Sequence, residues 1–173
     1  MKNILPKSAL VSLSDKSNLD LLVSFLLERN VEIISTGGTY KAIKKISNNV
    51  IEVSEYTGHK EMMDGRVKTL HPKIHAGILA RRGEDTDVLK SMDYKEIDIV
   101  VVNLYPFEET IKSGCSFEEA IEQIDIGGPT MIRAAAKNFK DVLVLSDPSD
   151  YEEMIGEWLS LIHISEPTRL ITI

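Results

Sequence analysis

"IDIVVVNLY", residues 97–105, is the stretch of this sequence that decides the fold. Its centre is an unbroken run of isoleucine and valine, the β-branched residues that strands favour. A continuous apolar run without alternation is typical of a parallel strand that is buried on both faces of its sheet. The stretch therefore predicts a central strand that lies between two layers of helices.

Shorter strand-like runs on either side of this stretch alternate with helical patterns. The clearest helix follows the first strand, where Leu19, Leu22, Val23, Leu26 and Leu27 recur at helical spacing. The other strands are expected at residues 9–14, 31–35, 50–54 and 142–146. The other helices are expected at residues 40–46, 73–82, 85–92, 116–124, 131–139 and 147–158. This alternation predicts an α/β fold with three layers and a mainly parallel central sheet, in which 50–54 is an edge strand.

Composition limits the classes of protein to consider. A chain of 173 residues with 43% hydrophobic residues is long enough for one domain with a real core. Its 27 acidic and 20 basic residues give a net charge of −7, which argues against a nucleic-acid-binding or anionic-membrane-binding surface. Cys115 is the only cysteine, so no internal disulfide can form, and Pro6 and Lys7 interrupt any signal-peptide pattern. We expect a cytoplasmic protein without a membrane span.

A second informative stretch, "GRVKTLHPKIHAG" at residues 65–77, gathers basic side chains and contains no acid. Guanidinium, ammonium and hydroxyl groups all donate hydrogen bonds that a phosphate accepts. Arg66, Lys68 and Thr69 therefore predict a loop that binds an anion. The alternative is a basic loop that only faces solvent.

The same stretch contains two histidines, His71 and His75, at a spacing that suits metal ligands on one helix face. Pro72 stands between them, and neither an HExxH pattern nor a neighbouring cysteine completes a metal site. We therefore expect no metal.

Two polar turns follow the first two expected strands: "SLSDKS" at residues 12–17 and "STGGT" at residues 35–39. Glycines between hydroxyl residues let backbone N–H groups approach an anion at the start of a helix. The alternatives are ordinary helix capping in the first turn and a glycine turn without a ligand in the second. Because parallel strands end at one edge, the two turns, with Arg66 and Lys68, favour a phosphate monoester site there.

Two further motifs carry candidate polar groups. "NLYP" places Asn103 and Tyr105 at the end of the central strand, where they suit a planar polar base, although a tyrosine there is more often packing. "IDIGGPT", residues 124–130, places Asp125 beside two glycines ahead of a helix. That helix carries Lys137 near its end, and the spacing leaves open whether Lys137 and Lys68 meet.

Five of these motifs resemble, in order and spacing, the N-terminal IMP cyclohydrolase domain of the bifunctional purine-biosynthesis protein family (AICAR transformylase/IMP cyclohydrolase). They are "SLSDKSNL", "ISTGGT", "GRVKTLHPKIHAGILARR", "NLYPF" and "EQIDIGGPTMIRAAAKN". The resemblance covers about residues 8–158. It implies a methylglyoxal-synthase-like domain that closes the formamido-carboxamide ribotide FAICAR to IMP with loss of water, without a cofactor. It also implies a homodimer, and fusion to a C-terminal transformylase domain that this chain lacks.

The resemblance also implies roles for individual residues. Lys68 would be the leading catalytic residue and Lys137 its partner, while Asp125 would orient the carboxamide and Tyr105 would bond near the reacting centre. The residues expected to bind substrate are Ser12, Ser14, Lys16, Ser35, Gly37, Gly38, Thr39, Arg66, Thr69, Asn103, Gly127 and Gly128.

The end of the chain departs from the family pattern. Residues 159–173, "LSLIHISEPTRLITI", do not resemble the family, and they have the character of translated adapter sequence. The alternative is a divergent terminal strand. We expect a cyclohydrolase domain at 1–158 that lacks its last part, followed by a tail without a family role.

Two other functions remain open at this point. Methylglyoxal synthase shares the fold and binds a phosphate, but it needs a differently placed carboxylate base. A regulatory nucleotide-binding domain of the same fold needs the phosphate loops but not paired lysines. A substitution at Lys68 distinguishes an enzyme from the regulatory domain, because a binding domain has no turnover to lose.

Overall fold

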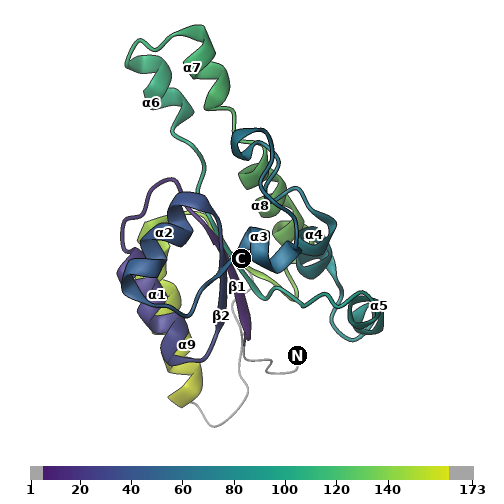
Figure 1. The fold of residues 1–173 in the computed structure, drawn as a ribbon. Coiled ribbons are helices and arrows are strands. Elements are labelled where there is room, and N and C mark those ends of the chain that lie inside the picture. Colours follow the sequence, from purple (N-terminus) through teal and green to yellow (C-terminus); the bar gives the residue numbers. More distant parts are fainter. Residues whose placement is uncertain (1–5, 164–173) are drawn as a thin grey trace.

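A five-stranded sheet forms the centre of the computed structural model, which describes residues 6–163. Its order is β3-β2-β1-β4-β5, and every pair of neighbouring strands is parallel (Figure 1). The strands are β1 Ser8–Ser12, β2 Glu32–Ser35, β3 Ile51–Glu52, β4 Ile99–Val102 and β5 Leu143–Leu145. The expected α/β fold with a parallel sheet is confirmed, and each strand lies where the sequence predicts one.

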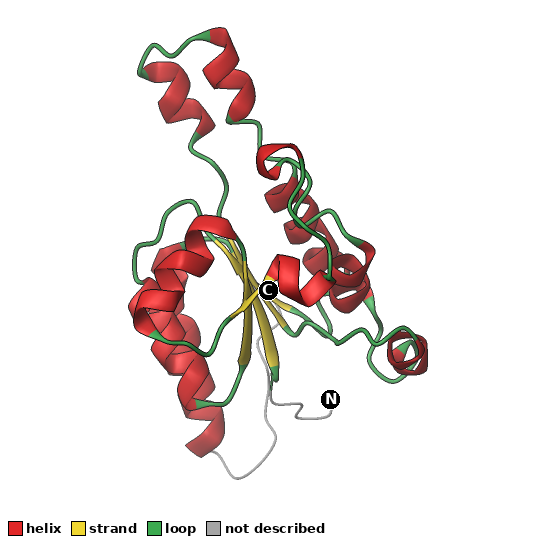
Figure 2. Cartoon of the chain, in the orientation of Figure 1, coloured by secondary structure: helices red, strands yellow, loops and turns green. Residues whose placement is uncertain are grey.

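Helices cover both faces of this sheet (Figure 2). They are α1 Leu19–Glu28, α2 Gly37–Ile46, α3 Val53–Thr57, α4 Pro72–Leu79, α5 Thr86–Ser91, α6 Phe107–Lys112, α7 Phe117–Glu122, α8 Gly127–Lys137 and α9 Tyr151–His163, with short 3₁₀ turns η1 Met63–Gly65 and η2 Pro148–Asp150. Helices α1, α2 and α9 pack on one face, and α3, α4 and α8 on the other. Helices α6 and α7 extend away from the sheet (Figure 1).

Strand β4 shows why the fold has three layers. All four of its residues are buried. Ile99 and Val101 join the apolar core beneath α1, α2 and α9, whereas Val100 and Val102 join the core beneath α3, α4 and α8. Because successive side chains of a strand point to opposite faces, a strand with four apolar residues needs a cover on both.

The structure differs from the expected elements in three places. The edge strand β3 has only two residues, because Val53 already starts helix α3. The glycines of both turns lie inside helices, since α2 begins at Gly37 and α8 begins at Gly127. Helix α6 had no counterpart among the expected elements.

The expected tail is only partly covered by the structure. Helix α9 continues to His163, so the backbone of residues 159–163 is helical, and residues 164–173 lie outside the described part of the chain. The boundary at residue 158 stays a prediction. Over residues 6–163, none of the helices has both the length and the apolar character needed to cross a membrane.

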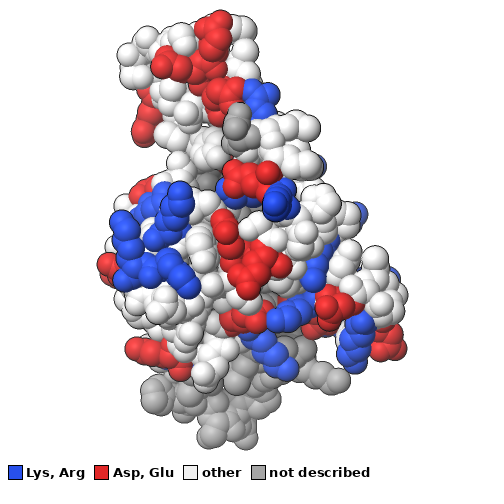
Figure 3. Space-filling view, viewed as in Figure 1, with Lys and Arg blue, Asp and Glu red and all other residues white. Residues whose placement is uncertain are grey.

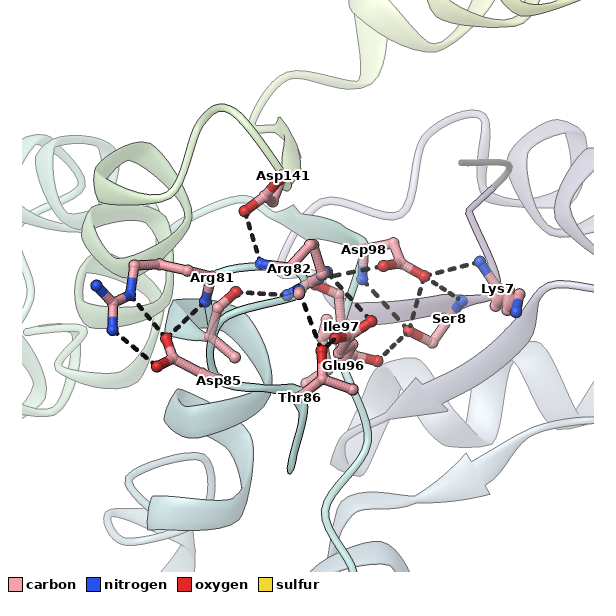
Figure 4. Close-up of polar contacts among 12 residues, drawn as sticks. Lys7, Ser8, Arg81, Arg82, Asp85, Thr86, Glu96, Ile97, Asp98 and Asp141 are labelled. Atoms are coloured by element: carbon pink, nitrogen blue, oxygen red, sulfur yellow. Dashed lines mark hydrogen bonds and ion pairs between the residues drawn. The ribbon is translucent and has the colours of Figure 1, made fainter. Parts of the chain in front are cut away.

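A buried polar cluster around Arg82 joins four segments at the amino ends of the strands (Figure 4). The guanidinium donates to Ala80 O at 2.7 Å, to Ile97 O at 2.8 Å and to Asp98 Oδ1 at 3.1 Å. Asp98 Oδ2 also accepts from the backbone N–H groups of Lys7 and Ser8, just before β1. The side chains of Arg82 and Asp98 are only 7% and 11% exposed, so the pair is shielded from water.

We predict that Arg82→Met lowers the free energy of unfolding by about 3 kcal/mol, because it leaves the Asp98 carboxylate buried without its cation. Urea denaturation followed by circular dichroism measures this. Arg81→Met is the matched control, since the neighbouring side chain is exposed and pairs with Glu84 and Asp85 on the surface. An equal loss in both variants would contradict a special role for the buried pair.

Histidine 71 caps helix α4. Its Nδ1 accepts a hydrogen bond from Lys73 N at 3.1 Å, which an imidazole can do only while that nitrogen is unprotonated. Burial lowers the pKa of His71, and the neighbouring His59 and Lys73 lower it further. Burial lowers the pKa of His75 as well. In the folded chain, the lowered pKa values favour the neutral form of both imidazole rings.

The stability of the fold should therefore fall as the pH falls below about 6.5, because the unfolded chain then binds protons that the folded chain resists. His71→Asn keeps a capping acceptor but does not titrate, so its free energy of unfolding should change less between about pH 7.5 and about pH 5.5. Urea denaturation at the two pH values checks this. The same pH slope in wild type and variant would show that His71 makes no contribution.

Candidate functional site

The turns after β1 and β2 are bonded to each other at the carboxyl edge of the sheet. Ser12 Oγ lies 3.0 Å from Thr36 Oγ1. Thr39 Oγ1 accepts from Leu13 N at 2.9 Å and donates to Leu13 O at the same distance. The structure thus brings together the two polar turns that the sequence places at one edge.

Three residues expected to bind substrate use their side chains inside the protein instead. Ser35 is fully buried and donates to Val11 O at 2.7 Å, and the hydroxyl of buried Thr39 is engaged with Leu13. Asn103 Oδ1 accepts from Ser14 N at 2.6 Å and from Asp15 N, and its Nδ2 donates to Asp15 O at 2.7 Å. These hydrogen bonds order the loops around the site, and contact of the three residues with substrate stays a prediction.

The amino end of α2 is surrounded by positive charge. A Cβ atom at Gly37 would lie 2.6 Å from Lys68 Nζ, and one at Gly38 would lie 4.0 Å from Lys16 Nζ. Gly37 also has a φ angle of +43°, which favours glycine. The first N–H groups of a helix lack partners within it and carry partial positive charge, and α2 has no side-chain cap. Two ammonium groups at such an end make a strong site for an anion.

The basic loop is less free than its sequence suggests, because two acids from outside it pair with its cations. Lys68 Nζ lies 2.9 Å from Glu61 Oε2. Arg66 pairs with Glu122 of α7, at the exposed end of the molecule where acidic side chains gather in Figure 3. The Arg66 side chain is therefore directed toward α7. The sequence analysis did not identify either acid as a partner. Glu122 is far from Arg66 in the sequence, and Glu61 lies just before the motif.

Thr69 connects the basic loop to a second helix end. It is buried, and its Oγ1 lies 2.5 Å from the position that a Cβ atom of Gly127 would take. Gly128 is equally crowded, because its Cβ atom would lie 2.6 Å from Leu104 Cδ2. A side chain at Gly127 would meet the hydroxyl of buried Thr69, and one at Gly128 would require Leu104 and Asp125 to shift. The basic loop, the loop after β4 and the amino end of α8 consequently meet at one place.

Two of the predicted catalytic residues stand beside this meeting point. Asp125 Oδ1 accepts from Gly128 N at 2.7 Å, so its carboxylate lies at the positive end of α8. Tyr105 is half exposed and lies next to Leu104, at the start of the segment that leads into α6. Asp125, Lys68 and Thr69 thus lie around one edge of the sheet, and the Tyr105 side chain lies beyond them, beside residues of α6.

Lys137 is the predicted catalytic residue that the structure does not bring there. Gly127 and Lys137 are the first and last residues of α8, which places them about 15 Å apart along the helix axis. The next residue, Asn138, donates to Ile78 O and Ala80 O at the far end of α4. Lys137 therefore lies at the opposite end of α8 from Gly127 and Thr69, and its pairing with Lys68 stays a prediction.

Histidines and acids do not gather into a metal site in the described part of the chain. Among residues 6–163, no three His, Cys, Asp or Glu residues lie close enough together to hold a metal ion. The chemistry that this edge offers is that of ammonium groups, a carboxylate, a phenol and backbone N–H groups.

Comparison with known proteins identifies relatives of the chain. Residues 19–130 match the MGS-like domain family. The chain is 58% identical over 153 residues to the bifunctional purine biosynthesis protein PurH of Clostridium acetobutylicum, and 57% identical over 154 residues to that of Clostridium perfringens. In both cases the match covers 87% of this chain.

A solved structure shares the fold as well. The crystal structure of ForH superimposes with a TM-score of 0.75 at 34% identity, covering 90% of this chain and 81% of the other. The chain spans only about a third of the length of its PurH relatives, 31% and 30% respectively. On the extent and identity of these matches, the chain belongs to the MGS-like domain family, and it is a PurH-like member of that family.

Proposed function

We propose that this domain is an IMP cyclohydrolase, which closes FAICAR to IMP with loss of water. The proposal draws on its similarity to bifunctional purine biosynthesis proteins. The observation that carries it is the position of two consecutive residues of the basic loop. Lys68 lies at the amino end of α2, and Thr69 lies at the amino end of α8. One loop thus spans both ends of a small ribotide site.

The reaction itself requires little more than positioning and charge stabilisation. The carboxamide nitrogen attacks the formyl carbon, so a new C–N bond forms and negative charge develops on the formyl oxygen. One proton moves from this nitrogen to the oxygen, which gives a hydroxyl group. The hydroxyl then takes up a second proton and leaves as water, while the former formamido nitrogen loses its proton and a C=N bond forms. An amide nitrogen is a poor nucleophile, so the rate depends on a near-attack geometry and on donors aimed at that oxygen.

The phosphate of the substrate would bind at the amino end of α2. Backbone N–H groups of Gly37 and Gly38 are available there, with Lys16 beside them. Arg66 would join them only after leaving Glu122, since the two side chains pair on the surface. The half-buried Ser12 and Ser14 stand on the neighbouring turn.

The heterocycle would then extend toward the amino end of α8. The Asp125 carboxylate can accept from the carboxamide N–H₂, which turns the nitrogen toward the formyl group. Tyr105 supplies a phenol as a donor to the formyl oxygen, and Lys68 supplies an ammonium from the α2 end of the loop, one residue before Thr69 at the α8 end. Thr69, Gly127 and Gly128 shape the wall between the two ends.

We predict that Lys68→Ala lowers kcat for FAICAR cyclisation by about a hundredfold or more, because it removes a charged donor from the developing oxyanion. IMP absorbance measures the rate, and circular dichroism checks the fold. Lys60→Ala is the control, since that exposed lysine lies in the segment that leads into the same loop. Wild-type rates in Lys68→Ala would contradict the proposal. A folded wild-type chain that binds phosphate but has no turnover would point to a regulatory domain.

The predicted homodimer and the predicted role of Lys137 fit this structure together only if Lys137 enters the site of a second copy. In that case Lys68→Ala and Lys137→Ala are each inactive, but a hybrid of the two has one site in which both lysines are intact. Random exchange of subunits should restore about a quarter of the wild-type rate. We would measure cyclisation before and after joint refolding. The absence of recovery from two inactive variants would contradict a shared site.

A further inference from the structure

We propose that Glu61 is a positioning residue, which holds the Lys68 ammonium at the amino end of α2 and is set against substrate phosphate at that place. The inference rests on the proposed function, in which Lys68 acts on the substrate. The motif that draws attention to Lys68 contains no acid, so the partner of this lysine comes from the segment before it.

The hairpin around Lys68 is built to accommodate this ion pair. Glu61 Oε2 lies 2.9 Å from Lys68 Nζ, and Met62 pairs with Val67 in an antiparallel bridge that brings the two side chains to the same end. A Cβ atom at Gly65 would lie 2.5 Å from Glu61 Oε1. Gly65 therefore leaves the space that the carboxylate occupies.

Lys68 needs such a partner because its surroundings repel it. Its ammonium lies against Gly37, at a helix end that carries partial positive charge, and Lys16 stands beside the next glycine. Without a carboxylate, the ammonium of a flexible side chain would move toward solvent. Glu61 offsets the repulsion at hydrogen-bond distance and fixes the direction of the side chain.

The same pair can be opened by a ligand. The side chains of Lys68 and Glu61 are 21% and 41% exposed, so water screens the attraction and the pair is weak enough to rearrange. A phosphate at the amino end of α2 would carry negative charge close to the Glu61 carboxylate. Glu61 thus weakens the binding of the anion and also orients Lys68. A variant without the carboxylate charge should therefore bind phosphate more tightly but have a lower kcat.

The test compares Glu61→Gln with Glu55→Gln in the full chain. Glu55 is an exposed acid of α3 in the preceding segment, and its loss changes the net charge equally. Calorimetry measures the binding of inorganic phosphate, the cyclisation assay gives kcat and KM, and a thermal melt reports stability. In Glu61→Gln we expect phosphate to bind about threefold more tightly. We expect kcat to fall on the order of tenfold, with an unchanged melting temperature. Glu55→Gln should change none of these.

Opposite changes in phosphate affinity and kcat support the positioning role, and Glu61→Asp, which keeps the charge, should recover part of kcat. A loss of phosphate binding, kcat and stability together would assign Glu61 a structural role and overturn the proposal. Unchanged phosphate affinity would overturn it as well. If the wild-type chain has no turnover, the cyclohydrolase proposal fails, and the phosphate measurement alone still decides whether Glu61 opposes the anion.

Discussion

Strand β1 pairs in parallel with both β2 and β4, and this pairing determines where every loop of the candidate site must lie. Leu10 is in register with Ile34 on one side and with Val100 on the other, so the three strands end at one edge. Helices α2 and α8 must then run back from that edge to start the next parallel strands, β3 and β5. Their amino ends therefore point to the place where the loops meet. The burial of apolar strands thus determines where the positively charged amino ends of α2 and α8 lie.

The charge at this edge is opposite in sign to that of the whole chain. The protein has a net charge of −7, yet two helix amino ends, Lys16 and Lys68 converge at the carboxyl edge. Uncompensated, this concentration of positive charge would destabilise the fold. Glu61 offsets part of this charge through an ion pair with Lys68, which is exposed enough to yield to a ligand. An anion site of this kind can be both stable when empty and attractive to a phosphate.

The sequence predicts the sheet well because apolar burial is a local property of "IDIVVVNLY" and its counterparts. It predicts side-chain roles less well, because a residue type gives the donors but not their partners. Ser35 and Thr39 are natural phosphate ligands by type, yet each bonds to the backbone after or within β1. The sequence places Lys137 near the end of its helix, as the structure does, but where that end lies relative to Lys68 depends on how α8 packs. The partner Glu122 depends on a tertiary contact that no spacing reveals, whereas Glu61 is placed by a local hairpin just before the basic loop.

Helices α6 and α7 are the elements near the site that pack least against the apolar core. Neither Phe107–Lys112 nor Phe117–Glu122 contains a buried residue, and Phe117 is 76% exposed. Helices this short are marginally stable alone. Because α7 buries no residue, its stability depends largely on local hydrogen bonds such as the capping box of Ser116 and Glu119. Tyr105 and Asp125 nevertheless lie at the two ends of this excursion, and Glu122 ties it to the basic loop through Arg66. A ligand that takes Arg66 from Glu122 would remove this tie between α7 and the basic loop, although a pair so exposed contributes little to the stability of α7.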